Sequence, residues 1–256
     1  ANGHWSVATV DVSAFGALTA TATDAAGNTG TSSAVTYTLD DSADDAGDTF
    51  AVSFATSDDV TNASEASHVS LTLAGVDADA ASVSVSIDDP SPAPAIVRSA
   101  TKVGDAWVVS DVDLTSLSEG TITVTATVTD AAGNTATATD TLTLDTVANE
   151  VPSVTIDAVS SDTDDADTSD FVTNQSSVTV TGTLSASLAA GQTVEYSVDG
   201  GANWTTLAAE SGISGTSLSF AEIDATTAPS IQVRVVDAAG NAGSTVLQAL
   251  SYDGTA

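Results

Sequence analysis

The sequence predicts an all-β chain made of tandem β-sandwich modules, and three observations carry this prediction. The pentapeptide DAAGN occurs at 24–28, 130–134 and 237–241, so successive copies lie 106 and 107 residues apart. Apolar residues alternate with Ser and Thr in short runs between these copies. No segment shows the apolar stripe and caps of an amphipathic helix. A fixed period of this length indicates a repeated structural unit.

The repeat also defines the modules. Each DAAGN copy is followed by a strand-like stretch that ends in Asp: TYTLD at Asp40, TLTLD at Asp145 and SYD at Asp253. We therefore divide the chain into the C-terminal part of a truncated module and two complete modules, which cover residues 1–40, 41–146 and 147–256.

The alternation predicts antiparallel sheets with one buried face. In the middle module, apolar residues take every second position over 69–73, 83–87 and 122–128. Gly, Asp and Asn separate such runs, as turns require, and the Gly of DAAGN suits a hairpin that needs a positive φ. About seven strands in a module of this length predict an immunoglobulin-like sandwich, and tandem copies predict an elongated array.

The charge of the chain excludes two classes of partner. Its 35 acidic residues outnumber three basic ones, which gives a formal net charge of −32. A surface of this sign repels phosphate backbones and anionic lipid, so we expect no nucleic-acid partner and no membrane insertion. Of the acids, 29 are Asp and six are Glu. A halophile-type acidic coat would explain the charge, whereas the preference for Asp favours loops that wrap a hard cation.

The Asp residues gather where modules are expected to meet. In the usual immunoglobulin strand order, the chain entry, the loop between the second and third strands and the final hairpin share one end of the sandwich. For the middle module, that end collects eight acids: Asp40, Asp41, Asp44, Asp45, Asp48, Asp77, Asp79 and Asp130. Unpaired carboxylates a few ångströms apart would each cost on the order of 1 kcal/mol. Because Ca²⁺ takes about six to eight oxygen ligands, we predict a Ca²⁺ site at this joint.

Two further Ca²⁺ sites are predicted in the last module. The entry of this module carries Asp145 and Glu150, and its hairpin carries Asp237. Its first loop, SSDTDDADTSDFVTN, is rich in Asp and contains Asp162, Asp164, Asp165, Asp167 and Asp170; alternate Asp residues in such a loop can turn their carboxylates towards one ion. The loop lacks the Gly and Glu of a helix–loop–helix calcium motif, and a disordered acidic loop remains the alternative. Bound Ca²⁺ would stabilise thin Val- and Ala-rich cores and stiffen the linkers.

Three segments carry a family resemblance: SDDVTNASEASHVSLTLAG, VTATVTDAAGNTATATDTLTLDT and TSDFVTNQSSVTVTG. They resemble the tandem bacterial immunoglobulin-like extender repeats of giant surface adhesins, the RTX and biofilm-associated adhesins exported by type I secretion. The resemblance implies a calcium-rigidified extender at the bacterial cell surface that holds a distal adhesive domain away from the cell. It implies neighbouring modules of the same chain as partners. It also implies that Asp40, Asp145, Asp130 and Asp237 are Ca²⁺ ligands.

Other residues of the chain bear on the alternative functions of catalysis and ligand binding. We expect no catalysis, because His4 and His68 are the only histidines and the chain has no Cys. A Trp precedes each DAAGN copy, at Trp5, Trp107 and Trp204. Exposed indoles would favour a carbohydrate- or host-binding module, whereas a Trp that recurs at one structural position is more often a core or edge plug. The truncated first module has open edges, so self-association into an extracellular filament or surface layer stays possible.

Overall fold

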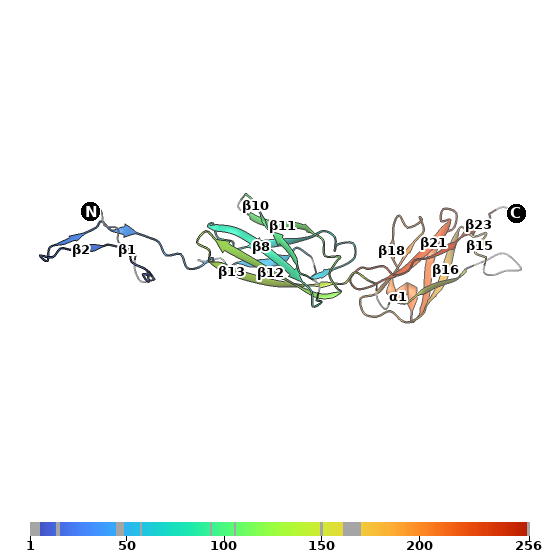
Figure 1. The fold of residues 1–256 in the computed structure, drawn as a ribbon. Helices are drawn as coiled ribbons and strands as arrows, with labels where there is room; N and C mark the ends of the chain where they lie inside the picture. Colours follow the sequence, from blue (N-terminus) through green and yellow to red (C-terminus); the bar gives the residue numbers. More distant parts are fainter. Residues whose placement is uncertain are drawn as a thin grey trace.

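The structure is a computed structural model that describes residues 6–13, 16–44, 49–56, 58–92, 94–104, 106–148, 151–160 and 170–254. Apart from the four-residue helix α1 (Ala209–Gly212), the regular elements in these ranges are β-strands. Two short strand pairs and two β-sandwiches follow one another along one long axis (Figure 1). The predicted all-β, elongated array is confirmed. In the described ranges no helix has the length and apolarity to cross a membrane.

The N-terminal part contains two short antiparallel pairs. Strands β2 (Thr21–Thr23) and β3 (Thr29–Thr31) flank the first DAAGN copy, and β1 (Ala17–Leu18) pairs with β4 (Val35–Thr36). All residues of these strands are exposed, and none of the described residues before Ala43 is buried. The described residues of this part therefore form no core of their own.

The middle sandwich consists of a four-stranded and a five-stranded sheet. The first has the order β10 (Thr101–Val103), β11 (Ala106–Val112), β7 (Val69–Ala74) and β5 (Ala51–Phe54). The second has the order β6 (Val60–Thr61), β13 (Thr135–Leu144), β12 (Gly120–Asp130), β8 (Ala80–Asp88) and β9 (Ile96–Ser99). Neighbours are antiparallel except for β6 and β13, which are parallel. Every second residue of β12 is buried from Ile122 to Val128, as the alternation predicts.

The last sandwich repeats this plan. One sheet has the order β14 (Val154–Val159), β16 (Ser177–Leu184), β20 (Ser217–Asp224) and β19 (Ile213–Ser214). The other has the order β18 (Thr205–Thr206), β17 (Thr193–Ser197), β21 (Ser230–Val236) and β22 (Val246–Ala249). The short strand β15 (Val172–Thr173) pairs in parallel with β23 (Ser251–Tyr252), as β6 does with β13. Phe220, Ile231 and Val180 lie at the centre of its core.

The Gly of each DAAGN copy permits the predicted hairpin. Gly27, Gly133 and Gly240 have φ angles of +88°, +97° and +94°, in the left-handed region that side chains disfavour. The first two copies join β2 to β3 and β12 to β13, and the third follows β21. Each hairpin therefore stands at an end of its strand pair, where it is free to meet the segment that enters its module.

Candidate metal centre at the module joints

The Asp and Asn of each DAAGN copy first of all form the turn. In the exposed first copy, Asp24 Oδ1 accepts hydrogen bonds from the main-chain nitrogens of Ala26 (2.9 Å) and Asn28 (2.8 Å). Its Oδ2 accepts from Asn28 Nδ2 at 2.8 Å. Asp130 and Asp237 accept the corresponding side-chain bond from Asn134 and Asn241, at 2.7 and 3.0 Å. The turn by itself thus explains why Asp and Asn occur together.

In the two later copies, the Asn side chain also reaches the segment that enters the module. Asn134 Nδ2 lies 3.1 Å from both the main-chain oxygen and Oδ1 of Asp40. Asn241 Nδ2 lies 2.8 Å from the main-chain oxygen and 3.3 Å from Oδ1 of Asp145. An amide has two hydrogens, and here one serves the turn while the other serves the boundary Asp. This second role of the Asn was not predicted, although the presence of Asn in all three copies of the motif was the available signal.

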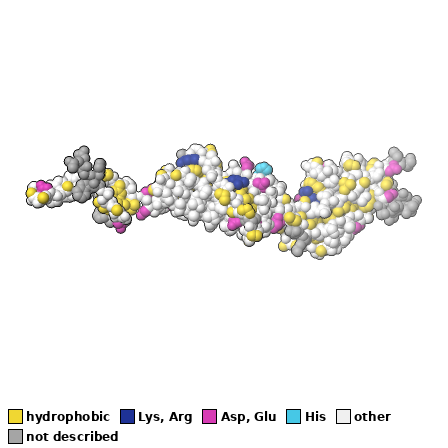
Figure 2. Space-filling view, in the orientation of Figure 1, with side chains coloured by type: hydrophobic (Ala, Val, Ile, Leu, Met, Phe, Trp, Pro, Cys, Tyr) yellow, Lys and Arg dark blue, Asp and Glu magenta, His cyan; other side chains and the backbone are white. Residues whose placement is uncertain are grey.

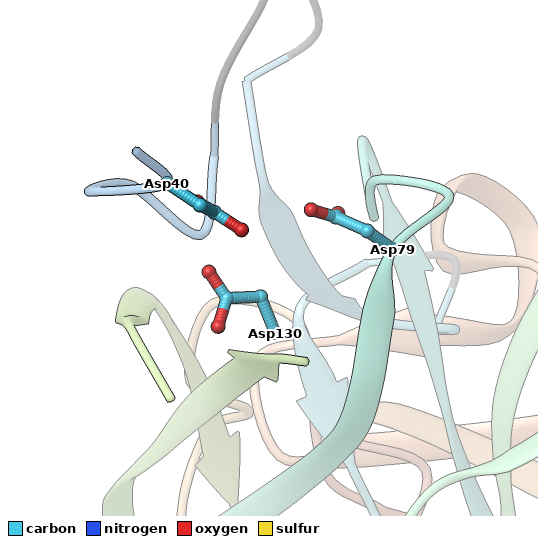
Figure 3. A group of neighbouring side chains, drawn as sticks. All are labelled: Asp40, Asp79 and Asp130. Atoms are coloured by element: carbon cyan, nitrogen blue, oxygen red, sulfur yellow. The ribbon is translucent and has the colours of Figure 1, made fainter. Parts of the chain in front are cut away.

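At the first joint, three of the predicted ligands come together. Asp40 lies on the entering segment, Asp79 directly precedes β8 and Asp130 ends β12; each offers a carboxylate oxygen, and these oxygens lie within 4.8 Å of one another. The three carboxylates converge on one space from different parts of the chain (Figure 3). Since Ca–O distances are about 2.3–2.6 Å, oxygens at these separations can contact one ion. The donor set therefore fits Ca²⁺, with main-chain oxygens and water to complete the shell.

The environment of Asp130 keeps its carboxylate charged, as a ligand must be. The residue is 3% exposed. Burial by itself would raise the pKa of Asp130, but hydrogen bonds from the Asn134 side chain and from the main chain of Asn134, Gly133 and Ala132 outweigh it and lower the pKa below its ordinary value. Asp40 is half-buried and Asp79 is exposed, so solvent and ions can reach the cluster.

The other acids predicted for this joint lie outside that group of three. The Asp44 carboxylate accepts a hydrogen bond from the main-chain nitrogen of Phe50 at 3.3 Å. Asp77 accepts from the main-chain nitrogen of Ala80 through its carbonyl oxygen, at 3.2 Å. Asp41 is exposed on the entering segment. In the described ranges, Asp40, Asp79 and Asp130 form the one group of three or more acidic or His side chains with ligand atoms so close together.

The second joint surrounds a cavity with acids. Asp145, Asp237 and Glu119 line a cavity of about 350 Å³, together with Gln192. Burial and the nearby charges of Asp237 and Glu119 raise the pKa of Asp145, despite a hydrogen bond from the Val147 main chain. Acidic side chains are visible at both narrow regions beside the middle sandwich (Figure 2). Glu119 was not predicted; it accepts a hydrogen bond from the main-chain nitrogen of Thr146 at 2.8 Å.

Comparison with known proteins agrees with this architecture. Residues 43–146 match a family model described as a bacterial Ig-like domain. The match spans almost the whole middle module, which is therefore referred to as the bacterial Ig-like domain after the family model that it resembles. No curated protein matches the chain.

Among solved structures, the chain is similar to a Ca²⁺-stabilized adhesin that helps an Antarctic bacterium reach out and bind ice, with 30% identity and a TM-score of 0.44. The alignment covers 94% of this chain and 58% of that one, so the chain spans little more than half of that structure. A 1.5-MDa bacterial ice-binding adhesin is 28% identical, with 92% and 73% coverage and a TM-score of 0.41. A tetra-tandem repeat from the extending region of a large adhesion protein is 23% identical, with 95% and 59% coverage and a TM-score of 0.32.

The remaining predicted ligands lie in the module that follows the bacterial Ig-like domain. Glu150 at the second joint and Asp162, Asp164 and Asp167 in the first loop lie outside the described residues. Asp170 is described and exposed. Its Oδ1 accepts a hydrogen bond from the main-chain nitrogen of Val172 at 3.0 Å, which forms a turn into β15.

The tryptophans do not share one structural position, so that expectation is wrong. In the bacterial Ig-like domain Trp107 lies on β11, whereas Trp204 of the last module lies outside the strands, directly before β18, which belongs to the sheet that does not correspond to that of β11. The same order along the sequence did not place them on the same strand, because the two modules space their strands differently. Both are half-buried, and each indole is covered by a cation: Lys102 Nζ lies 5.6 Å and the Arg234 guanidinium 3.9 Å from the ring centroids. Trp5 lies outside the described residues.

Proposed function

We propose that the chain is a calcium-stabilised extender segment of a large bacterial surface adhesin, which projects a distal adhesive domain from the cell. The observation that carries this proposal is the meeting of Asp40 with Asp79 and Asp130. Asp40 belongs to the segment that enters the bacterial Ig-like domain, and the other two belong to its sandwich. An ion held by all three would fasten the entering segment to the end of the sandwich.

Charge supports a cation at this place. Three carboxylates lie together in a chain that has three basic side chains in all. Of these, Arg234 is already paired with Glu195 of the last module at 2.7 Å. When Ca²⁺ is present at about 100 times the dissociation constant, each occupied site adds about 2.7 kcal/mol to the folded state. Such a term is a large fraction of the stability of a small domain.

The second joint extends the proposal. Asp145 and Asp237 of the lined cavity, with Glu150, are proposed to hold a second ion, and the first loop of the last module a third. The raised pKa of Asp145 supports this, because a divalent cation would relieve the repulsion by Asp237 and Glu119 that burial strengthens. Asp41, Asp44 and Asp77 would add negative charge around the first ion. Neighbouring modules of the same chain are the partners that this proposal requires.

The adhesin part of the proposal comes from the sequence motifs and the family of the middle module. Extender repeats need modules that follow one another, and the sandwiches here do so along one axis (Figure 1). Location at the outer surface of a bacterium follows from the same resemblance, and Ca²⁺ is abundant enough there to fill sites of about 10⁻⁴–10⁻³ M affinity.

Small-angle scattering of the whole chain, in excess Ca²⁺ and in EDTA, tests the proposal together with thermal unfolding. We expect Ca²⁺ to raise the melting temperature and to increase the maximum dimension of the chain. We also expect the scattering in Ca²⁺ to fit a smaller range of bent conformations. Mg²⁺ at the same concentration is the control, because it prefers a tighter octahedral shell and should have a smaller effect. Identical scattering and melting in Ca²⁺ and EDTA would overturn the calcium-stiffened rod.

A further inference from the structure

The second joint contains hydrogen bonds between modules that involve no acidic side chain. In the loop between β6 and β7, Asn62 Nδ2 donates to the main-chain oxygen of Ala239 in the last module, at 3.0 Å. In the opposite direction, the main-chain nitrogen of Ala63 donates to Oδ1 of Asn241, at 2.9 Å. Each module therefore contributes one asparagine side chain and one main-chain group to a reciprocal contact.

The side chain of Asn241 uses all its polar groups in this contact and in the turn. Its Nδ2 donates to Asp237 Oδ2 and to the main-chain oxygen of Asp145, at 3.0 and 2.8 Å, while its Oδ1 is occupied by Ala63. The residue is 5% exposed. A buried amide whose donors and acceptor are all satisfied favours one geometry, because any rotation of the modules would leave one of these groups unpaired.

Asn62 is held ready for the contact by its own loop. Its Oδ1 accepts from the main-chain nitrogen and the hydroxyl of Ser64, at 2.9 and 2.7 Å, and from the main-chain nitrogen of Glu65 at 3.2 Å. This local turn fixes the side chain and leaves Nδ2 directed at the hairpin of the last module. Gly240 allows the approach, since a Cβ there would lie 3.2 Å from Asn62 Nδ2.

The two modules place the same short sequence at the same end. VTN occurs at 60–62 and at 172–174. The main-chain nitrogen of Asp145 donates to the oxygen of Thr61 at 3.0 Å, and that of Asp253 donates to Thr173 at 2.9 Å. The Asn of VTN thus follows a strand that lies beside the boundary Asp in both modules, at the end where the chain leaves the sandwich.

We propose that Asn62 and Asn241 form an asparagine clasp, which fixes the last module on the bacterial Ig-like domain without a metal ion. The partner of the VTN end of a module is the DAAGN hairpin of the module that follows it. The inference deepens the proposed function, because it concerns a joint of the proposed rod, but its two hydrogen bonds between modules join Asn62 to Ala239 and Ala63 to Asn241, none of which is a proposed Ca²⁺ ligand. When Ca²⁺ is removed, the second joint therefore keeps these two bonds in addition to the contact between the DAAGN Asn and the boundary Asp that both joints share.

Distances between two spin labels across the second joint, measured by electron–electron double resonance, test the clasp. The chain has no Cys, so Thr137→Cys on β13 and Thr205→Cys on β18 introduce two labels at exposed positions of the two modules. In EDTA we expect a narrow distance distribution for this labelled chain. Asn62→Asp keeps the oxygen that forms the local turn and removes the amide hydrogens, so we expect the distribution to become at least about twofold broader.

Asn174→Asp is the matched control, because Asn174 holds the same place in VTN, is exposed and accepts a hydrogen bond from its neighbour Gln175 at 2.5 Å. It adds the same charge and should leave the distribution unchanged. Asn62→Ser provides a second variant without added charge, in case Asn62→Asp fails to fold. Equal widths for the labelled chain and both Asn62 variants in EDTA would overturn the clasp, as would a distribution that is already broad with Asn62 intact. If the unmodified chain binds no Ca²⁺ at the first joint, the proposed function is overturned and the clasp still stands.

Discussion

The side-chain nitrogen of Asn134 lies 3.1 Å from a carboxylate oxygen of Asp40 and 2.7 Å from a carboxylate oxygen of Asp130. One neutral amide therefore bridges two of the three carboxylates that form the candidate Ca²⁺ site. The hairpin and the entering segment are held together before any ion binds. Pre-organisation of this kind reduces the conformational entropy that the ligand side chains lose when an ion binds.

Asn134→Ala should weaken the attachment of the entering segment. The substitution leaves the main-chain oxygen of Asp40 without this donor and removes one bond of the turn, so we expect the bacterial Ig-like domain to lose about 1–3 kcal/mol of stability. Asn28→Ala is the control, because Asn28 makes the same turn contact in the exposed first copy. Urea unfolding in EDTA measures both. Equal, small effects would show that the contact with Asp40 contributes nothing.

Asp130→Asn should reduce the Ca²⁺ affinity of the first joint. The substitution removes one charged ligand, and we expect a loss of at least about tenfold, which corresponds to about 1.4 kcal/mol. Asp24→Asn changes the same turn position in the first copy and should leave Ca²⁺ binding intact. Isothermal titration calorimetry checks the affinity, and an unchanged value for Asp130→Asn would remove this residue from the ligand set.

Asp79→Asn should reduce the stabilisation by Ca²⁺ and leave the stability of the calcium-free chain nearly unchanged. Asp79 is exposed, so in EDTA the stability should change by less than about 0.5 kcal/mol. The rise in melting temperature caused by Ca²⁺ should become smaller. Asp77→Asn alters an acid of the same loop that lies outside the group of three, and should retain most of the Ca²⁺ response. A larger effect for Asp77 than for Asp79 would contradict the geometry described above.

Asp145→Asn should stabilise the calcium-free chain. The folded pKa of Asp145 lies above its ordinary value because burial and the charge of Asp237 disfavour the carboxylate, so the cost of this group is present at neutral pH. The folded state binds the proton more tightly, so this cost decreases as pH falls through the folded pKa and is absent below the ordinary pKa of the unfolded chain. We expect a higher unfolding midpoint in EDTA at pH 7 and a smaller Ca²⁺ response. A lower midpoint would show that its charge is already compensated.

Asp89 should make the bacterial Ig-like domain sensitive to acid. Hydrogen bonds from the side chain of Ser91 and the main chain of Ser118 lower the pKa of Asp89 to about 2, against the effect of burial. A folded pKa below the unfolded value means that the stabilisation is present above about pH 4 and is lost as pH falls towards 2. As the pH falls from 4 to 2.5, the Asp89→Asn variant should therefore lose less stability than the unmodified chain. The midpoints of urea unfolding measure this difference. Asp88→Asn, at an exposed neighbour, should follow the unmodified chain.

Much of the fold follows from the sequence because its causes are local. The alternation at Val83, Val85 and Ile87 selects one face of a strand, and all three are buried in the core. The Gly of DAAGN needs only its own φ to form a hairpin, so three copies predict three turns. The recurrence of Trp gave a wrong expectation because side chains on different strands can precede the same hairpin.

The tertiary structure decided which polar groups meet. Asp77 and Asp79 are neighbours in one loop, yet Asp79 alone joins Asp40 and Asp130, because its place directly before β8 puts it at the end of the sandwich beside the hairpin. The contact of Asn62 with the hairpin of the next module joins residues that are 177 positions apart in the sequence. A pattern of neighbouring residues cannot predict a contact over such a separation. Composition and period thus determined that the chain is a string of acidic sandwiches. The packing of strand ends and modules determined where acids and amides come close enough to bind an ion or one another.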